Sequence, residues 1–361
     1  MAAGGGRVSG VRAHVAVQRA HFAVDVAIHA APGETVAVMG PSGAGKSTLV
    51  GAIAGFVPID RGEIAIGDRV VERAGDGVRR HVPAMRRGVV LLGQDARLFP
   101  HLSAGENVAF GPRASGASRA QARALAAEWL ERVGLPGTSA RRPRELSGGE
   151  QQRVAVARAL AAAPRAVLLD EPLVALDPAT AAGIRTMLRE QLAGTTTIAV
   201  THDAVDAAAL ADRLVVLEAG AITQQGAVRE VFAAPATAFV AAIAGLNRLL
   251  GRAAGGLFHG IGDAAGLTLA SADPASRALA VPEGAGIAAV FRPADVRVGG
   301  ADGAWRTTVS RLEPTPAGVR VWAGGCAVDL EAASAAGLHP GDGVSLTVPP
   351  ECVRFVATLV S

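Results

Sequence analysis

The feature that most constrains this chain is a glycine-rich loop that follows a short apolar segment. The loop consists of Gly40, Pro41, Ser42, Gly43, Ala44, Gly45, Lys46, Ser47 and Thr48, and it matches the phosphate-binding pattern G-x-x-x-x-G-K-[ST]. In that pattern the backbone N–H groups surround the β-phosphate, the lysine reaches the β- and γ-phosphates, and the first hydroxyl ligates Mg²⁺. Lys46 is the only lysine among 35 basic residues. Because a forked guanidinium does not replace a compact ammonium in a glycine cradle, this single lysine favours a phosphate site over a chance turn.

The segments around this loop alternate between strand and helix patterns. We expect strands at Glu34–Met39, Gly88–Gly93, Ala166–Asp170, Thr195–Thr201 and Arg213–Glu218, and two antiparallel strands within residues 7–30. We expect helices from Lys46 onward and at 117–134, 149–162, Pro178–Leu192 and Ala204–Ala211. This alternation predicts an α/β fold with a mostly parallel sheet that is covered by helices.

Two neighbouring carboxylates follow the apolar residues Ala166–Leu169. Asp170 and Glu171 would stand at the carboxyl end of a buried strand, which is the edge where parallel sheets bind ligands. There, Asp170 would hold Mg²⁺ and Glu171 would act as the general base on the attacking water. Taken alone, an apolar strand ending in Asp-Glu is common, and the upstream loop is what makes this interpretation strong.

A second candidate phosphate site is formed by Ser147, Gly148 and Gly149. Read as structure only, these residues cap an ordinary helix. Read as function, they expose backbone N–H groups at the positive end of that helix. Because one nucleotide does not need two cradles within one chain, we expect this site to meet the γ-phosphate held by the loop of another copy.

The run Leu146–Glu150 stands about twenty residues before Leu168–Pro172 and downstream of the glycine-rich loop. In this it resembles the nucleotide-binding subunit of ABC transporters, over roughly residues 7–240. The resemblance implies a P-loop ABC cassette with a RecA-like core, an antiparallel β subdomain and a helical subdomain. It also implies ATP and Mg²⁺ as cofactors and a head-to-tail homodimer that sandwiches two ATP.

The same resemblance assigns roles to further residues. Gln94 looks like the Q-loop glutamine that touches Mg²⁺ and senses a permease. Asp177, after Ala175 and Leu176, looks like the D-loop residue at the dimer seam, and His202 looks like the switch histidine. The catalytic set is then Glu171, His202, Lys46 and Gln94, with Ser47, Gln94 and Asp170 at Mg²⁺.

The adenine contact and the permease contact are less clear from the sequence. Many relatives stack an aromatic residue on adenine about twenty positions before the loop, and here the candidates are Arg19, His21 and Phe22. The segment from Gln94 to Gly111 resembles the importer groove that receives a permease helix. Leu98, Phe99 and Leu102 would be its exposed apolar anchors, or else part of the core.

The composition limits the remaining functions. With 35 basic and 32 acidic residues the net charge is +3, which is too small to indicate a nucleic-acid partner. No apolar run is long enough for a transmembrane helix, and Met1–Gly10 lacks the apolar stretch of a signal peptide. We therefore expect a peripheral protein at the cytoplasmic face of the membrane that works with separate permease subunits and, through them, an extracytoplasmic substrate-binding protein. A soluble ABC ATPase and another P-loop enzyme remain the alternative classes.

The C-terminal third is expected to be a small all-β domain. Short apolar runs separated by Gly, Pro and Asp begin near Ile287, and Phe291–Val296 resembles the entry strand of the regulatory TOBE/Mop-type barrel of importers. We expect an ABC ATP-binding domain at 1–240, a linker with first strands at 241–285, and an OB-like TOBE/Mop regulatory domain at 286–361. Cys326 and Cys352 are expected to be core thiols of a protein in a reducing compartment.

Several details favour an oxyanion, molybdate first, as the imported substrate. They are Gln94–His101, Asn107–Gly111 and Gly245–Asn247. Molybdate-binding barrels often carry an S-A-R-N-like loop, whereas this chain has Gly303–Arg306 near that place. Sulfate, iron(III), polyamine and sugar importers share the same architecture and stay open as alternatives.

Overall fold

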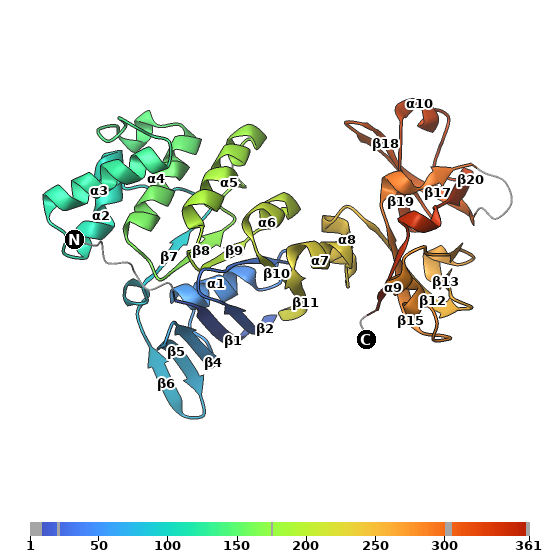
Figure 1. The fold of residues 1–361 in the computed structure, drawn as a ribbon, viewed down its shortest axis with the longest axis horizontal. Coiled ribbons are helices and arrows are strands. Elements are labelled where there is room, and N and C mark those ends of the chain that lie inside the picture. The colour runs from blue at the N-terminus through green and yellow to red at the C-terminus, as the bar shows by residue number, and fades with distance from the viewer. Residues whose placement is uncertain (1–8, 20–21, 175, 300–304, 359–361) are drawn as a thin grey trace. The chain divides into compact units, whose positions relative to one another are not determined.

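The computed structural model describes residues 9–19, 22–174, 176–299 and 305–358 (Figure 1). The glycine-rich start of the chain, His21, Ala175 and the pair Gly303–Ala304 fall wholly or mainly outside these residues. The chain divides into two compact units between Val228 and Arg229. The domain boundaries expected from the sequence, 1–240, 241–285 and 286–361, stay a prediction.

The first unit contains an antiparallel sheet with the strand order β2-β1-β4-β5-β6. Its strands are β1 (Val11–Arg19), β2 (Phe22–Ala30), β4 (Arg61–Ile66), β5 (Arg69–Gly75) and β6 (Val78–His81). Strand β1 pairs with β2 in a register that places Val11 opposite Ala30, which confirms the predicted antiparallel pair. Strands β4–β6 were not predicted, because charged residues interrupt the apolar alternation there and all four residues of β6 are exposed.

The central sheet of this unit has the strand order β11-β10-β3-β9-β8-β7. Its strands are β3 (Thr35–Met39), β7 (Val89–Leu92), β8 (Ala166–Asp170), β9 (Thr197–Val200), β10 (Arg213–Glu218) and β11 (Ala221–Ala227). All but β11 run parallel, as predicted. Leu92 lies beside Leu169, and Asp170 lies beside Val200. The segments that follow β3, β7, β8 and β9 therefore all emerge at the same edge of the sheet.

Helices cover this sheet and divide the core in two. They are α1 (Lys46–Ala54), α2 (Ala104–Ala114), α3 (Arg119–Arg132), α4 (Gly148–Ala161), α5 (Pro178–Leu192) and α6 (Ala204–Leu210). Successive residues of β8 face opposite sides, so Leu168 packs with α1 and the antiparallel sheet, and Leu169 packs with α2–α5. None of the described helices is long and apolar enough to span a membrane.

The second unit is a small, mainly β domain. Its sheets have the strand orders β14-β13-β12-β15-β21 and β16-β20-β17-β18-β19, and together they form a nearly closed barrel. The strands are β12 (Asn247–Ala254), β13 (Leu257–Gly260), β14 (Thr268–Leu269), β15 (Gly286–Phe291), β16 (Arg297–Val298), β17 (Trp305–Thr315), β18 (Gly318–Ala323), β19 (Cys326–Leu330), β20 (Gly343–Thr347) and β21 (Arg354–Ala357). Cys326 is buried in the shared core, as expected, whereas Cys352 is only half-buried.

Short helices accompany the strands of this unit, and the expectation of an all-β domain did not include them. The structure has short helices α7 (Val228–Ala233), α8 (Ala238–Ile243), α9 (Pro274–Leu279) and α10 (Ala332–Ala335). Each has only four to six residues, so no helical period is visible in the sequence. Side-chain caps fix two of them, since Thr237 accepts from the N–H of Val240 and Asp273 from that of Ser276.

Candidate nucleotide-hydrolysis site

The glycine-rich loop connects β3 to α1, as the sequence predicts. Gly43 and Gly45 have φ values of 80° and 106°, a region that favours glycine. A side chain at Gly43 would meet nothing within 4 Å, whereas a Cβ on Gly45 would lie 2.6 Å from Val24 Cγ2. The loop is therefore packed on its inner side at Gly45 and open to a ligand at Gly43.

Lys46 is buried at the first position of α1 without an ionic partner. Its Nζ donates to the carbonyl oxygens of Gly40, at 2.7 Å, and Pro41, at 2.9 Å. No ion pair joins it to a carboxylate among the described residues. Burial lowers the pKa of Lys46, while the carboxylates Glu171 and Asp170 act in the opposite direction. A buried cation held only by backbone carbonyls fits an anionic ligand such as a nucleotide phosphate.

The acidic pair stands at the end of β8. Burial, and then the charge of Glu171, raises the pKa of Asp170. Glu171 adopts a left-handed backbone with φ 52°, and its N–H donates to Val200 O at 3.0 Å. Because such a conformation is costly for a residue with a side chain, it marks a position that the surrounding structure enforces.

Two predicted residues reach the Glu171 carboxylate from other strands. Gln94, which follows β7, donates its Nε2 to Glu171 Oε2 at 3.0 Å. His202, which follows β9, places Nδ1 at 3.5 Å from Glu171 Oε1. The segments that follow β7 and β9 thus both reach the carboxylate that follows β8.

The oxygen donors suit Mg²⁺ only together with a ligand. Ser47, Gln94 and Asp170 supply a hydroxyl, an amide and a carboxylate, which are the hard donors that Mg²⁺ accepts. In the parts of the chain that the structure describes, no group of three or more His, Cys, Asp and Glu side chains is arranged to hold a metal ion. Since Mg²⁺ is commonly held by one or two carboxylates plus substrate phosphates, this donor set fits a nucleotide-bound ion.

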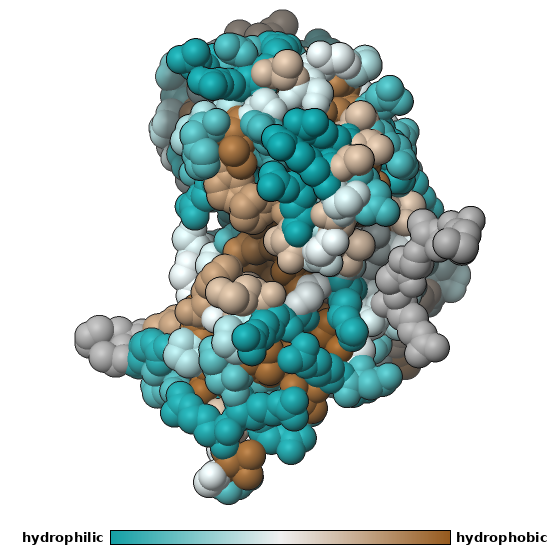
Figure 2. Space-filling model, turned by 90° about the vertical axis from the view of Figure 1, so that its left-hand side faces the viewer, coloured by the Kyte–Doolittle hydropathy of each residue, from teal (hydrophilic) through white to brown (hydrophobic). Residues whose placement is uncertain are grey.

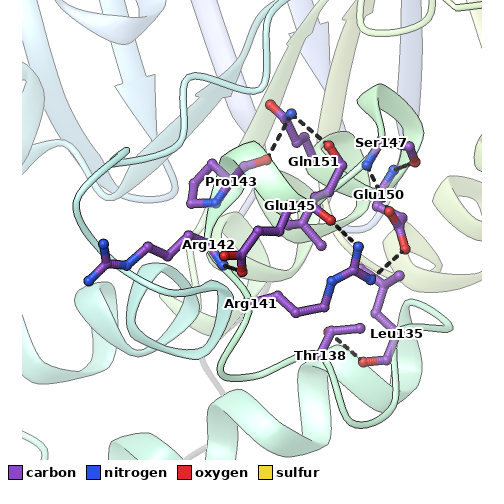
Figure 3. A network of polar contacts seen from close by, with 10 residues as sticks. Leu135, Thr138, Arg141, Arg142, Pro143, Glu145, Ser147, Glu150 and Gln151 are labelled. Atoms are coloured by element: carbon purple, nitrogen blue, oxygen red, sulfur yellow. Dashed lines mark hydrogen bonds and ion pairs between the residues drawn. The ribbon is translucent and has the colours of Figure 1, made fainter.

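Ser147, Gly148 and Gly149 form the start of α4, as predicted. Ser147 caps the helix: its hydroxyl accepts from the Glu150 N–H, and Glu150 accepts from the Ser147 N–H. Figure 3 shows how this loop is held from behind, where Gln151 donates to the carbonyls of Pro143 and Leu146 and Arg141 pairs with Glu150. Ser147 and Gly148 themselves are exposed, so the helix end is rigid yet open.

Asp177 is the N-cap of α5 and accepts from the Thr180 N–H at 3.0 Å, which lowers the pKa of its carboxyl group. Of the adenine candidates, Arg19 is exposed and directed to Asp60 and Gln18. Phe22 is half-buried, with Cζ 3.1 Å from a Cβ built on Gly45. His21 lies outside the described residues.

A groove of about 810 Å³ adjoins this site. Phe56, Met85, Leu91, Gln94, Arg158 and Asp170 are among its lining residues, and Figure 2 shows hydrophobic side chains gathered in a hollow on one face of the molecule. The predicted anchors Leu98, Phe99 and Leu102 are half-buried rather than exposed. Leu98 packs into the helical core, and the Asn107 side chain forms hydrogen bonds with the backbone of Phe99 and Leu102. The exposed apolar side chains of this region are Phe56, Met85 and Phe110.

Comparisons with known proteins agree with this geometry. The family description "ABC transporter" matches residues 24–174. The iron(III) import ATP-binding protein of Streptomyces avermitilis is 44% identical over 292 residues, which cover 80% of this chain and 77% of that protein. The chain belongs to the ABC transporter ATP-binding family. It accordingly has the fold and the Mg²⁺–ATP site of an ABC cassette.

Other members of this family differ in the substrate that their names state. The molybdenum import ATP-binding protein of Mycobacterium tuberculosis is 48% identical over 247 residues, 67% of this chain and 65% of that protein. The chain thus spans less than two thirds of that relative. The spermidine/putrescine import protein of Acidothermus cellulolyticus is 41% identical, with 76% and 71% covered. The solved ATP-binding cassette MJ0796, described as a dimer bound to ADP and Pi, is 30% identical with a TM-score of 0.52 and covers 61% of this chain and 99% of its own.

Sequence reasoning missed residues that hold the site in place. Gln152 is buried and donates to Pro172 O at 3.0 Å, beside Glu171. Arg87, wholly buried and paired with Glu72, donates to Ala52 O at the end of α1. Gln152 stands in the polar run Glu150–Arg153, so the sequence does not mark it as buried.

Proposed function

We propose that this chain is the ATP-hydrolysing subunit of an ABC importer that takes up an oxyanion, with molybdate as the first candidate. The observation that carries the hydrolysis is the convergence of Gln94 and His202 on the Glu171 carboxylate. An ABC cassette used only for binding would not need a carboxylate positioned in this way.

In the proposed reaction the γ-phosphoryl group of ATP passes to water. Lys46 would bind the phosphates of ATP, and Ser47, Gln94 and Asp170 would hold a Mg²⁺ ion, which would supply positive charge to them. Glu171 accepts a proton from the attacking water while the bond to the ADP oxygen breaks, and His202 orients the water and contacts the γ-phosphate.

We further propose that two copies act head to tail. The exposed start of α4 at Ser147–Gly149 offers backbone N–H groups to the nucleotide on the partner, and Asp177 lies at the seam. The dimeric cassette MJ0796, of the same family, supports this arrangement.

The partner in the membrane is proposed to be a permease whose cytoplasmic segment enters the groove near Met85. Met85 is 90% exposed and Phe56 is 67% exposed, which is unusual for large apolar side chains. The protein would then lie peripherally on the cytoplasmic face of the membrane, and an extracytoplasmic binding protein would deliver the substrate to the permease. No nucleic-acid partner is proposed.

The choice of molybdate rests on the 48% identity to the molybdenum import protein. Iron(III) import proteins match at 44% and 49% identity and a polyamine import protein at 41%, so iron(III), polyamine, sulfate and sugar are the competing substrates. The C-terminal β unit is proposed to be a TOBE/Mop-like regulatory domain.

The test is the ATPase rate of the protein reconstituted with its permease in liposomes. Binding protein loaded with molybdate, tungstate, sulfate, iron(III) or spermidine is added in separate arms. Stimulation by molybdate and tungstate alone is expected. Stimulation only by another ligand would contradict molybdate, and stimulation by none would contradict all of these ligands and leave sugar as the competing substrate.

A further inference from the structure

Arg158 lies on α4, and its guanidinium group contacts backbone carbonyl oxygens and an aromatic ring. Its Nη1 donates to Arg97 O at 2.9 Å and its Nη2 donates to Ala96 O at 3.0 Å. Its guanidinium carbon also lies 5.3 Å from the centre of the Phe99 ring. Among the residues that the structure describes, no carboxylate forms an ion pair with it. The half-buried guanidinium therefore fastens one short segment, Ala96–Phe99, to α4.

Ala96 and Leu98 of this segment pack against the helical core, and its backbone follows an irregular path. Arg97 has φ 42°, a conformation that a residue with a side chain adopts only when neighbours enforce it. The segment forms no strand or helix. Beyond it, Asn107 of α2 holds the next turn by accepting from the Phe99 N–H at 2.8 Å and donating to Leu102 O at 3.2 Å. Hydrogen bonds from the side chains of Arg158 and Asn107 thus take the place of the backbone hydrogen bonds of a strand or helix. Of these two residues, only Arg158 belongs to α4.

The fastened segment is part of the groove wall. Ala96, Arg97 and Arg158 all line the groove, together with Gln94. An occupant of the groove would therefore press on the segment that Arg158 holds. Burial lowers the pKa of Arg158, but an arginine stays charged in proteins, so the two carbonyls and the ring compensate a permanent, half-buried cation.

Helix α4 connects this point to the hydrolysis site. Gly148 and Arg158 are ten residues apart, or about 15 Å along the helix axis. Midway, the buried Gln152 donates to Pro172 O, next to Glu171. At its start, Gly149 packs against α5, because a Cβ built there would lie 2.6 Å from Thr180 Cγ2. One helix therefore contacts the groove, the residue that follows the acidic pair and the helix that Asp177 caps.

We propose that Arg158 is a positioning residue that couples the groove to α4, so that occupation of the groove moves the Ser147–Gly149 end and Pro172 together. The proposal rests on the proposed function, because the occupant is a segment of the permease. Arg158 does not touch the reacting atoms, and it acts through the helix that carries it.

The test compares Arg158→Lys with the matched control Arg132→Lys. Lysine keeps the charge but loses the fork that reaches two carbonyls. Arg132 also lies over an aromatic ring, 4.0 Å from the centre of Trp129, and donates to the side-chain oxygen of Gln191 at 3.1 Å, but it pairs with Glu128 and does not line the groove. Two readouts are taken: amide hydrogen exchange of the full-length protein, and ATPase with and without the permease.

Arg158→Lys is expected to speed exchange at the Phe99 and Leu102 amides about tenfold, the effect of losing one charge-assisted hydrogen bond. It is expected to lower the permease-stimulated rate about tenfold, while the KM for ATP and the basal rate of the isolated protein stay within about twofold. The control is expected to change neither readout in this region.

Unchanged exchange at Phe99 and Leu102 would overturn the fastening role of Arg158. Faster exchange with full stimulation, or an equal loss of stimulation in the control, would overturn the coupling. A wild-type protein that its permease does not stimulate would instead contradict the proposed function, and the coupling would fall with it, while the exchange comparison would still decide the fastening role.

Discussion

Replacing Glu171 by Gln tests the base at the centre of the proposed site. The Glu171 side chain is 22% exposed, and the amide keeps an acceptor oxygen for Gln94 Nε2, so we expect the variant to keep its fold. The variant loses the carboxylate that accepts the proton of the attacking water. General bases of this kind contribute about 10²- to 10⁴-fold, so we expect a loss near 10³-fold, or about 4 kcal/mol in the barrier.

The assay is phosphate release at saturating ATP, run beside a nucleotide-binding titration. Binding of ATP is expected to stay within about threefold, because Lys46 and the loop are untouched, and dimers are expected to accumulate with ATP and Mg²⁺. The control Glu63→Gln removes an exposed carboxylate that pairs with Arg73 and is expected to keep full activity. Residual hydrolysis within tenfold of wild type would refute the role of Glu171 as base.

Three further predictions follow from single side chains. Lys46→Ala is expected to weaken ATP binding at least about 100-fold in a nucleotide titration, because it removes the one buried cation of the loop, and unchanged affinity would contradict this. Glu72→Gln leaves the buried Arg87 without its counter-charge, so the free energy of unfolding measured in urea is expected to fall by about 3–5 kcal/mol. The control Glu63→Gln is expected to lower it by less than about 1 kcal/mol. Equal losses in the two variants would contradict the argument from burial. Burial raises the pKa of Cys326 to about 12, so its thiolate is scarce at pH 8 and a thiol reagent is expected to label it only after unfolding; rapid labelling of the folded protein would contradict the core position.

The sequence predicted most of the first unit because its elements are locally marked. The run Ala166–Leu169 is continuously apolar and lies within β8. Asp177 and Pro178 are a typical helix start, and α5 begins there. Gln94, Glu171 and His202 also meet, since each follows the end of a parallel strand at one edge of the sheet.

Other parts were missed for physical reasons. Helix α2 contains Gly105, Gly111 and Pro112, which hide its period, although the capping box formed by Ser103 and Glu106 was a usable signal. The contacts of Arg158 could not be predicted, because they join a helix to a loop sixty residues away and depend on the packed fold.

The central claim is that ATP hydrolysis at Glu171 drives import of an oxyanion. The most direct measurement is uptake of radiolabelled molybdate into liposomes that contain the permease and this protein, with ATP on the side of the ATPase and loaded binding protein on the other. Uptake that requires ATP, stops with Glu171→Gln and is blocked by excess tungstate but not sulfate is the predicted result. Uptake that proceeds equally with Glu171→Gln, or no molybdate uptake beside uptake of iron(III) or spermidine, would contradict the account.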